Sequence, residues 1–528
     1  MEITIHRGIN QIGGCITEIV TKSSKILIDL GHNLPKGDNL VKDSKANKIA
    51  IEKLTKNCDA IFYTHYHGDH VDLFKYVPVE IEQYIGEVAK QVMKCKYEIL
   101  SSLPNKTSIK PVDVQLLDSF KTFREKQKIR KGDITITPYF VSHSACDAYM
   151  FLIEADGKRI LHTGDFREHG YLGKGLLKTI QAYILKNGEV DILITEGTML
   201  SRLKETVKHE NDLKQEAIAL IKQYKYVFIL CSSTDIDRLA VFNQACKANK
   251  RSFLCDGYQQ KILKIFSETV GLKNALYKFD YTYYYKHEDK TQFSLIEKRG
   301  FCMLVRSKHF NQVRSLLTQL PEEQTLLIYS MWSGYINDGE NQKKEYLELY
   351  NLFKNRRSLH TSGHASPESL AKVCNLVNPT TAIIPIHSEK SDEFEKLPIT
   401  ENLKAKILTS SVARGDVLIR IWDDDRLYFK NTDDWWGFWN EARRPAREAL
   451  LRQPKLSIEE VHEQAERNRR IRNENRIKSE KDFYFDIQKS ETEWLEDMTK
   501  YGFSLDELEE LMKENKEILL KIIGRKSE

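Results

Sequence analysis

A short run of histidine and aspartate carries the strongest chemical signal in this sequence. It is Thr64-His-Tyr-His-Gly-Asp-His70, directly after the apolar segment Ala60-Ile-Phe-Tyr-Thr64. On an extended segment, residues i and i+2 point the same way, so His65 and His67 are placed to share one metal ion. The turn opened by Gly68 directs Asp69 and His70 towards a second ion. Surface histidines in a polar turn are the weaker alternative, because chance rarely produces this string.

Two metal ions need more than four ligands, and three later segments offer them. Each places a histidine or aspartate at a strand end or in the adjoining loop: Val141-Ser-His143-Ser, His162-Thr-Gly-Asp165-Phe and Ile384-Pro-Ile-His387-Ser-Glu389. Singly these signals are weak, since a lone loop histidine is more often structural. Together they predict one site of His65, His67 and His143. They predict a second of Asp69, His70 and His387, with Asp165 bridging the two ions.

This ligand set predicts hydrolytic chemistry. Imidazole and carboxylate ligands suit Zn²⁺ and also accept Mn²⁺ or Fe. Two such cations about 3.5–4 Å apart activate a bridging water and offset charge in a displacement at phosphorus. We therefore count Asp69 among the catalytic residues. Asp29, at the end of Ile26-Leu-Ile-Asp29, is a candidate to orient a ligand histidine, with an ordinary turn aspartate as an equal alternative.

The framework that must position these residues reads as an α/β fold. Short apolar runs bounded by turn residues predict strands at Lys25–Asp29, Ala60–Thr64, Ile134–Pro138, Arg159–His162 and Asp191–Thr195. A helical pattern surrounds Ile85–Glu98. Strands and helices mixed in this way predict α/β layering.

At 528 residues the chain exceeds one hydrophobic core, so we expect more than one domain. Residues 1–200 form the first part of a domain that resumes at residues 359–428 with a strand at Ala382–Pro385. Residues 201–358 form an inserted α/β unit, because the pattern of the first segment resumes after His360. It has strands near Val227–Leu230 and Leu326–Tyr329, and helices around Asp212–Gln223 and Asp237–Asn249. Residues 429–528 read as a charged helical C-terminal extension that packs on the body or a partner.

The amino-acid composition is typical of a globular protein. Hydrophobic residues at 41% and charged residues at 30% are ordinary for a globular protein, and the net charge of +5 leaves a local basic channel open. Nine scattered cysteines without a CxxC pair predict buried, reduced thiols instead of a disulfide framework. The N-terminus has no apolar signal core and no stretch is long enough to span a bilayer. We therefore expect a cytoplasmic protein.

At this point the motifs resemble the β-CASP branch of the metallo-β-lactamase superfamily, and within it the ribonuclease J family. The shared lactamase motifs match at Arg7–Gly14, Ile28–Gly31, His65–His70, His143 and Thr163–Asp165. The β-CASP motifs match at Ile194-Thr-Glu196-Gly-Thr (motif A), His360-Thr-Ser-Gly-His364-Ala-Ser366 (motif B) and Pro385-Ile-His387 (motif C). The resemblance covers about residues 1–425. It implies a metallo-β-lactamase αββα sandwich with residues 201–358 as an inserted β-CASP α/β domain.

The resemblance also implies that His364 protonates the leaving oxygen while Glu196 holds its ring in a suitable tautomer. The residues themselves place this loop at a helix start, since Ser366 is a good N-cap and Pro367 a good first helical residue. Helix N-termini bind phosphate, and a simple capped loop is the alternative. The expected phosphate or substrate contacts are Ser362, Gly363, His364, Ala365 and Ser366, with Ser232 and Ser233 before another helix.

Motif C bears on the substrate. In this family a histidine there accompanies RNA-processing members, whereas DNA-repair members of the Artemis type carry an apolar residue. His387 therefore implies a ribonuclease acting on single-stranded RNA, endonucleolytically or 5′ to 3′. A DNA nuclease, a small-molecule or ester hydrolase, and a non-catalytic scaffold are the alternatives. Ser388 and the extension depart from ribonuclease J, so a homo-oligomer or protein partner through residues 429–528 stays open.

Two aromatic segments are further candidates for contacts with RNA. The patch Tyr281-Thr-Tyr-Tyr-Tyr285 lies beside Lys286 and Lys290, and such a composition can stack bases. We favour a β-hairpin with ordinary packed tyrosines. Trp332, in Ser330-Met-Trp-Ser-Gly334, is expected near the domain junction as pocket wall or core.

Overall fold

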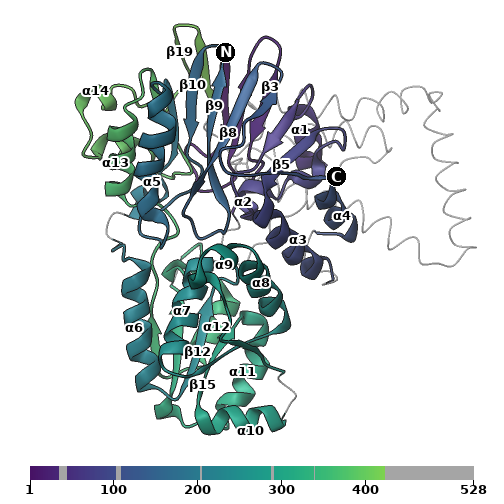
Figure 1. Cartoon of the computed structure of the whole chain (residues 1–528), viewed down its shortest axis with the longest axis vertical. Coiled ribbons are helices and arrows are strands. Elements are labelled where there is room, and N and C mark those ends of the chain that lie inside the picture. Colours follow the sequence, from purple (N-terminus) through teal and green to yellow (C-terminus); the bar gives the residue numbers. More distant parts are fainter. Residues whose placement is uncertain (35–44, 103–108, 203–204, 287–289, 338, 423–528) are drawn as a thin grey trace, which may run out of the picture. The chain divides into compact units, whose positions relative to one another are not determined.

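The computed structural model describes residues 1–34, 45–102, 109–202, 205–286, 290–337 and 339–422 (Figure 1). The chain divides into two units, Met1–Leu427 and Tyr428–Glu528. The helical extension predicted for residues 429–528 lies outside the described residues. Everything below concerns the first unit.

Two sheets within the described residues build the layer that holds the candidate site. The first, in spatial order, is β19 (Val412–Arg414), β20 (Val417–Ile421), β1 (Glu2–Arg7), β2 (Ile16–Val20), β3 (Lys25–Ile28), β4 (Ala60–Phe62), β5 (Glu82–Gly86) and β6 (Lys121–Phe123). The second is β18 (Ala382–Ile386), β11 (Ile192–Glu196), β10 (Lys158–His162), β9 (Ala148–Ala155), β8 (Ile134–Val141) and β7 (Ile129–Lys131).

Successive side chains of each strand point to opposite faces of its sheet, so every second side chain can pack between the two sheets. In β9, Phe151 and Ile153 point into a core shared with Ile26 and Phe62 of the first sheet. The intervening Leu152 points to the opposite face of the second sheet. Burial on both faces is what a strand in the middle of a layered α/β fold requires.

Helices cover the outer faces of this pair of sheets. α5 (Leu176–Thr179) and α13 (Pro367–Val377) share a second core with the outward side chains of the second sheet. α3 (Glu87–Ser101) packs against β5 and β6 of the first. The remaining helices of this part are α1 (Lys45–Leu54), α2 (Gly68–Val71), α4 (Pro111–Ser119) and α14 (Glu401–Lys404). The arrangement is an αββα sandwich (Figure 1).

A third sheet lies between β11 and β18 in the chain, and all its strand pairs are parallel. Its order is β14 (Thr282–Tyr284), β13 (Ser252–Cys255), β15 (Phe301–Val305), β12 (Tyr226–Cys231), β16 (Thr325–Ser330) and β17 (Arg356–Ser358). Its helices are α6 (Glu210–Gln223), α7 (Ile236–Ala248), α8 (Gly257–Glu268), α9 (Val270–Lys273), α10 (Lys290–Arg299), α11 (Phe310–Leu317) and α12 (Lys344–Asn351). The domain boundaries at residues 201 and 358 stay a prediction.

β11 and β18 are direct neighbours although the whole third sheet separates them in sequence. They pair in parallel from Ile192 opposite Ala382 to Glu196 opposite Ile386. The carboxyl ends of neighbouring parallel strands meet at one sheet edge. This pairing therefore brings the residues that follow Glu196 beside His387.

The predicted strands, helices and cysteine states can be compared with the structure. The expected strands and insert helices are present within a few residues, but the helix predicted from Ile85 begins at Glu87, because Ile85 and Gly86 end β5. The hairpin expected at Tyr281–Tyr285 is wrong: β14 is an edge strand parallel to β13. All nine cysteines are buried and free, as predicted.

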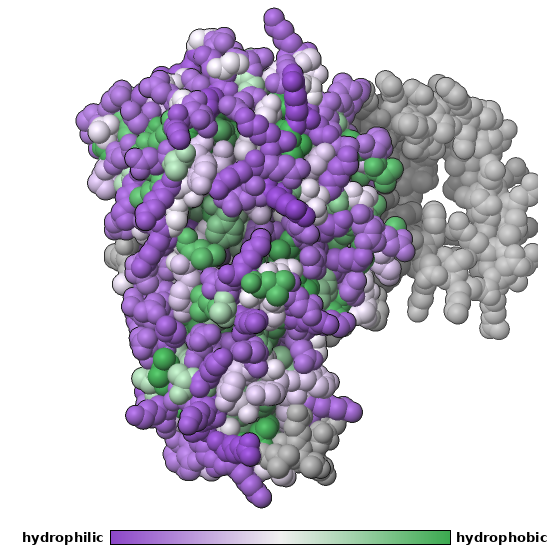
Figure 2. Space-filling model, in the orientation of Figure 1, coloured by the Kyte–Doolittle hydropathy of each residue, from purple (hydrophilic) through white to green (hydrophobic). Residues whose placement is uncertain are grey.

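One face of the described part is mostly polar. On the face drawn in Figure 2, hydrophilic residues predominate and hydrophobic residues form scattered patches. In the described segments no helix combines the length and apolar character needed to cross a membrane. A cytoplasmic location stays a prediction.

Candidate metal centre

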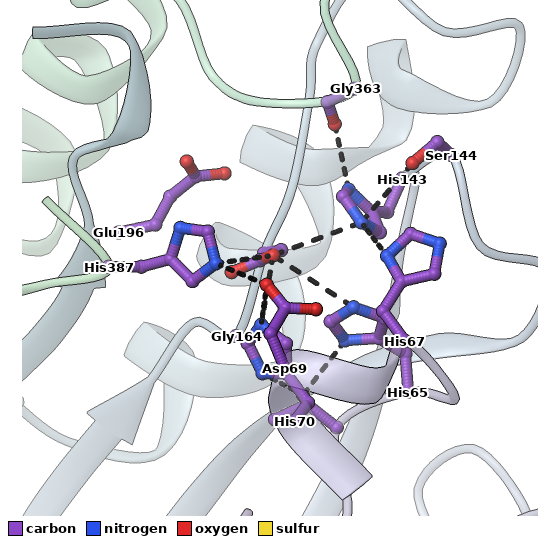
Figure 3. Close-up of polar contacts among 12 residues, drawn as sticks. His65, His67, Asp69, His70, His143, Ser144, Gly164, Glu196, Gly363 and His387 are labelled. Atoms are coloured by element: carbon purple, nitrogen blue, oxygen red, sulfur yellow. Dashed lines mark hydrogen bonds and ion pairs between the residues drawn. The ribbon is translucent and has the colours of Figure 1, made fainter. Parts of the chain in front are cut away.

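Histidine and aspartate side chains from both sheets converge at the carboxyl ends of their strands (Figure 3). The His65–His70 turn follows β4, and Asp165 lies three residues beyond the end of β10. The backbone joins the two sheets here, since the Tyr149 N–H of β9 donates to the Thr64 carbonyl over 3.0 Å. The cluster therefore sits in the loops and the short helix α2 that follow these strands.

One half of the cluster consists of His65, His67 and His143. Ligand nitrogens of these three side chains lie within 4.8 Å of one another. His143 Nε2 is 3.2 Å from His67 Nδ1, and its Nδ1 lies 2.7 Å from the Gly363 carbonyl oxygen. If Nδ1 carries the proton and donates to Gly363, Nε2 is left as an acceptor that can bind a metal.

The other half gathers Asp69, His70 and His387 around Asp165. His387 Nε2 is 3.2 Å from Asp69 Oδ2 and 3.6 Å from Asp165 Oδ2. His70 Nε2 lies 3.2 Å from the same Asp165 oxygen, and His65 and His143 Nε2 are each 3.9 Å from it. Asp165 is therefore central to both halves of the cluster, and its role as a bridging ligand stays a prediction.

The electrostatics of the cluster suit metal binding. Burial lowers the pKa of His65 and His143 well below the ordinary value and that of His67 to about 4, so these imidazoles are neutral. Burial opposes ionisation of Asp165, but the surrounding histidines outweigh it and hold its pKa well below the usual range. Among the described residues, buried His65 Nε2 has no hydrogen-bond partner. Neutral imidazoles, ionised carboxylates and this unsatisfied nitrogen fit divalent cations.

Asp29 lies directly behind this cluster. Its carboxylate oxygen Oδ2 is 2.8 Å from His70 Nδ1. The same carboxylate accepts hydrogen bonds from the Thr64 backbone N–H over 2.7 Å and from the Thr64 hydroxyl over 2.8 Å. Asp29 therefore fixes which nitrogen of His70 faces Asp165, as expected of a residue that orients a ligand.

Buried Glu196 and partly buried His364 form a pair beside the cluster. Glu196 Oε2 is 3.1 Å from His364 Nδ1, and Oε1 accepts hydrogen bonds from Phe166 N (2.9 Å) and Ala365 N (3.3 Å). Burial lowers the pKa of His364, but the Glu196 and Asp165 carboxylates outweigh burial and raise it above the ordinary value. His364 is thus protonated more readily than a free histidine.

The motif B loop begins a helix as predicted, but its N–H groups are partly used. Ser366 caps α13, accepting from Ser369 N over 3.2 Å, and Pro367 is the first helical residue. The N–H of His364 donates to Ser362 Oγ, and that of Ala365 donates to Glu196. A phosphate role for residues 362–366 stays a prediction.

Ser232 and Ser233 lie in the loop before α7, whose N-cap is Asp235. Ser232 Oγ accepts from Thr234 N over 3.4 Å, and Ser233 Oγ is 3.3 Å from the Tyr258 hydroxyl. The Thr234 carbonyl in turn accepts from Tyr66 of the metal-binding turn over 3.0 Å. This loop therefore contacts the His65–His70 turn, and its phosphate role also stays a prediction.

Sequence reasoning missed two residues at the centre of the cluster. Thr198 Oγ1 lies 2.7 Å from His387 Nδ1 and 3.2 Å from His364 Nδ1, so one hydroxyl contacts both histidines. Its position two residues after Glu196 in motif A was the available signal. Cys15 Sγ approaches His70 and His387, and burial raises the thiol pKa well above its ordinary value.

A buried charge network behind the motif B loop was also missed. Arg167 donates to Glu210 (2.9 Å), to Asp237 (2.9 Å) and to the Ser362 carbonyl (3.2 Å). Arg238 donates to both Glu210 oxygens, and to the Thr361 carbonyl over 3.3 Å. Both arginines are completely buried. They tie the backbone just before His364 to helices α6 and α7.

Two protein-family models match this chain. A Beta-lactamase superfamily domain covers residues 25–226, and a Zn-dependent metallo-hydrolase RNA specificity domain covers residues 353–407. The first includes the His65–His70 turn, His143 and Asp165, and the second includes His364 and His387. The first match identifies a metallo-β-lactamase superfamily domain within this chain. The chain is a metal-dependent hydrolase.

The chain is also similar to several curated proteins. It is 22% identical to "Ribonuclease J" of Mycoplasma genitalium over 451 residues, 80% of this chain and 74% of that protein. It is 23% identical to "Ribonuclease J" of Helicobacter pylori (strain B128) over 74% of this chain and 56% of that protein. It is 26% identical to an "RNase J-like protein" of Methanocaldococcus jannaschii over 38% of this chain and 43% of that protein.

The fold is also found among solved structures. A protein of unknown function from Enterococcus faecalis V583 matches with a TM-score of 0.57 and 20% identity, over 77% of this chain and 97% of that one. At this identity the match concerns the fold alone.

Proposed function

We propose that this protein is a ribonuclease that hydrolyses RNA phosphodiester bonds at a centre of two divalent cations, Zn²⁺ or Mn²⁺. The main observation behind this proposal is that a cluster of potential metal-ligand side chains adjoins the separate pair of Glu196 and His364. Asp165, within the cluster, is 3.7 Å from His364 Nδ1, and His364 contacts Glu196. The RNA specificity match and the similarity to ribonuclease J proteins support RNA as the substrate.

The ligands proposed for the two cations are those predicted from the sequence. One ion is held by His65, His67 and His143, which form a compact group of donors. The other is held by Asp69, His70 and His387, supported by the 3.2 Å approach of His387 to Asp69. Asp165 is the ligand between them. When bound, such ions supply an activated water and stabilise negative charge on a phosphoryl oxygen.

The chain's own residues then handle the proton on the leaving oxygen. Glu196 accepts the Nδ1–H of His364, so the protonated ring presents its second proton from Nε2. Transfer of that proton to the departing ribose oxygen prevents an alkoxide from accumulating. The carboxylates around the ring favour the protonated form, which is the form this role needs.

The test is cleavage of end-labelled substrates. Purified full-length protein is incubated with 5′- and 3′-labelled single-stranded RNA, and with DNA of the same sequence, in the presence of Zn²⁺ or Mn²⁺. We expect cleavage of RNA in preference to DNA, and the product ladder separates endonucleolytic from 5′-to-3′ cleavage. Preferential cleavage of the DNA, or of neither polymer, would contradict the proposal.

Variants separate the metal centre from contaminating nucleases. Asp69→Ala and His70→Ala should abolish cleavage without unfolding the protein, since each removes a proposed ligand. Asp118→Ala is the matched control, because this carboxylate is exposed on α4 and pairs only with Lys94 among the described contacts of its side chain. Full activity in Asp69→Ala would reject the ligand assignment.

A further inference from the structure

A row of cationic and aromatic side chains begins beside the metal cluster. The Arg202 guanidinium lies over the Trp332 ring at 4.5 Å, and the Trp332 and Tyr335 rings meet edge to face at 5.3 Å. Lys343 then lies 4.7 Å from the Tyr335 ring and 5.7 Å from the Tyr346 ring. We call these five residues the aromatic row. They come from two parts of the chain, because Arg202 follows β11 while the other four follow β16.

Two observations place the row next to the proposed catalytic residues. Arg202 ends the short 3₁₀ helix Thr198–Arg202, whose first residue contacts His364 and His387. Burial raises the pKa of the Tyr335 hydroxyl, and the Asp69 carboxylate adds to that rise. Tyr335 is therefore within electrostatic reach of a proposed metal ligand.

The row keeps part of its surface accessible. All five of its side chains are only partly buried, in contrast to the fully buried rings of the cores. The backbone holds the indole in place from one side, since an added Cβ at Gly334 would come within 2.6 Å of Trp332 Cζ3. Folding alone does not need a partly exposed alternation of rings and cations beside the proposed catalytic residues.

We propose that the aromatic row is a binding subsite for single-stranded RNA, in which nucleobases stack on Trp332 and Tyr335 while Arg202 and Lys343 neutralise phosphates. Rings have a face for every base, and cations beside them track the backbone, so the subsite accepts RNA without sequence preference. This inference rests on the proposed ribonuclease function. It specifies where a strand entering the centre is held.

The test measures binding of two RNA probes to full-length protein in an Asp69→Ala background, which prevents cleavage. One probe is a fluorescein-labelled oligouridylate, and the other is the same ribose–phosphate chain without bases. Trp332→Ala should raise the Kd for oligouridylate about 5- to 150-fold, the loss of one stacked base. The Kd for the abasic chain should change less than about twofold.

Further variants keep the test decisive. Trp332→Leu preserves apolar volume and should behave like Trp332→Ala, so a misfolded alanine variant does not end the test. Trp332→Phe should restore most of the affinity. The matched control is Tyr183→Ala, which removes another exposed aromatic ring. Lys126 Nζ lies 3.7 Å from the centroid of that ring. Arg202→Gln should lower the salt dependence of RNA binding by about one phosphate contact.

Each outcome decides the inference. An unchanged Kd in Trp332→Leu would overturn it, and so would an equal loss for both probes, which would indicate a backbone contact or a purely structural ring. Failure of the proposed function gives a different result, since the unmodified protein would then not cleave RNA in the ladder assay while its binding to the two probes could still be compared.

Discussion

At the scale of single residues, two side chains of the cluster sit on strained backbone. Asp29 has φ of 61° and His387 has φ of 52°, a region that non-glycine residues seldom occupy. Such conformations cost about 1–3 kcal/mol each and persist where surrounding contacts fix them. The Asp29 contacts to Thr64 and the Thr198 contact to His387 are such restraints. Backbone strain here serves to aim two side chains.

Replacing Asp29 by asparagine should weaken metal binding without disturbing the fold. Asparagine tolerates positive φ, but a neutral amide holds the His70 ring less firmly than a carboxylate. We expect metal affinity to fall about 10- to 100-fold, measured by competition with a chromogenic chelator. Asp59→Asn is the control, because within the described residues the Asp59 carboxylate accepts a hydrogen bond from the Lys25 N–H at a strand start. Unchanged affinity in Asp29→Asn would show that this contact is structural.

His364→Ala should slow turnover far more than it weakens RNA binding. A general acid acts mainly in the transition state, so we expect kcat to fall about 10²- to 10⁴-fold. The Kd for RNA should stay within about threefold. Glu196→Gln should also lower kcat more than it weakens RNA binding, but to a smaller extent. The His364 ring is still present in this variant, and only its charged partner is lost. Equal losses in kcat and affinity would identify His364 as a phosphate anchor instead.

At the scale of elements, helices α6 and α7 are held against the segment before His364 by buried charge. Glu210 lies between Arg167 and Arg238, and all three are fully buried. Burial opposes the ionised carboxylate, but the two arginines outweigh it and lower the pKa of Glu210 to about 2. The network therefore links the position of α6 to the Thr361 and Ser362 carbonyls.

Glu210→Gln should destabilise the protein by about 3–5 kcal/mol at neutral pH, because two buried arginines lose their shared counter-charge. The folded-state pKa of Glu210 lies below the unfolded value, so its contribution is complete above about pH 4.5 and is lost as pH falls towards about 2. Urea denaturation should show the two proteins converging over that range. Glu216→Gln on the same helix, whose carboxylate is exposed and paired with Lys208, should change stability by less than about 0.5 kcal/mol.

At the scale of the whole molecule, the two facing sheets meet at a cluster rich in ligands. Metal binding to the folded state alone stabilises that state with the logarithm of the metal concentration, by about 1.4 kcal/mol for each tenfold increase above Kd. Chelation should therefore lower the Tm and abolish RNA cleavage together, and Zn²⁺ or Mn²⁺ should restore both. Asp69→Ala should show a smaller metal-dependent rise in Tm. A chelated protein that keeps its Tm and its activity would contradict the metal proposal.

Much of the local structure could be predicted from the sequence because it depends on neighbouring residues. Short apolar runs bounded by turn residues marked the strands whose ends carry the ligands, and the i, i+2 spacing paired His65 with His67. Ser366 and Pro367 marked the start of α13. The relation between distant residues such as Glu196 and His364 was predicted from the resemblance to a known family, since no local rule connects them.

Only the tertiary structure decided which distant elements become neighbours. The pairing of β11 with β18 places Thr198 against His387 across the length of the third sheet, and no periodicity encodes that pairing. The same holds for Arg167 with Glu210 and for Arg202 with Trp332. Local patterns fix where a side chain points along its own strand or helix. Packing of whole sheets and helices, summed over many weak contacts, fixes what that side chain meets.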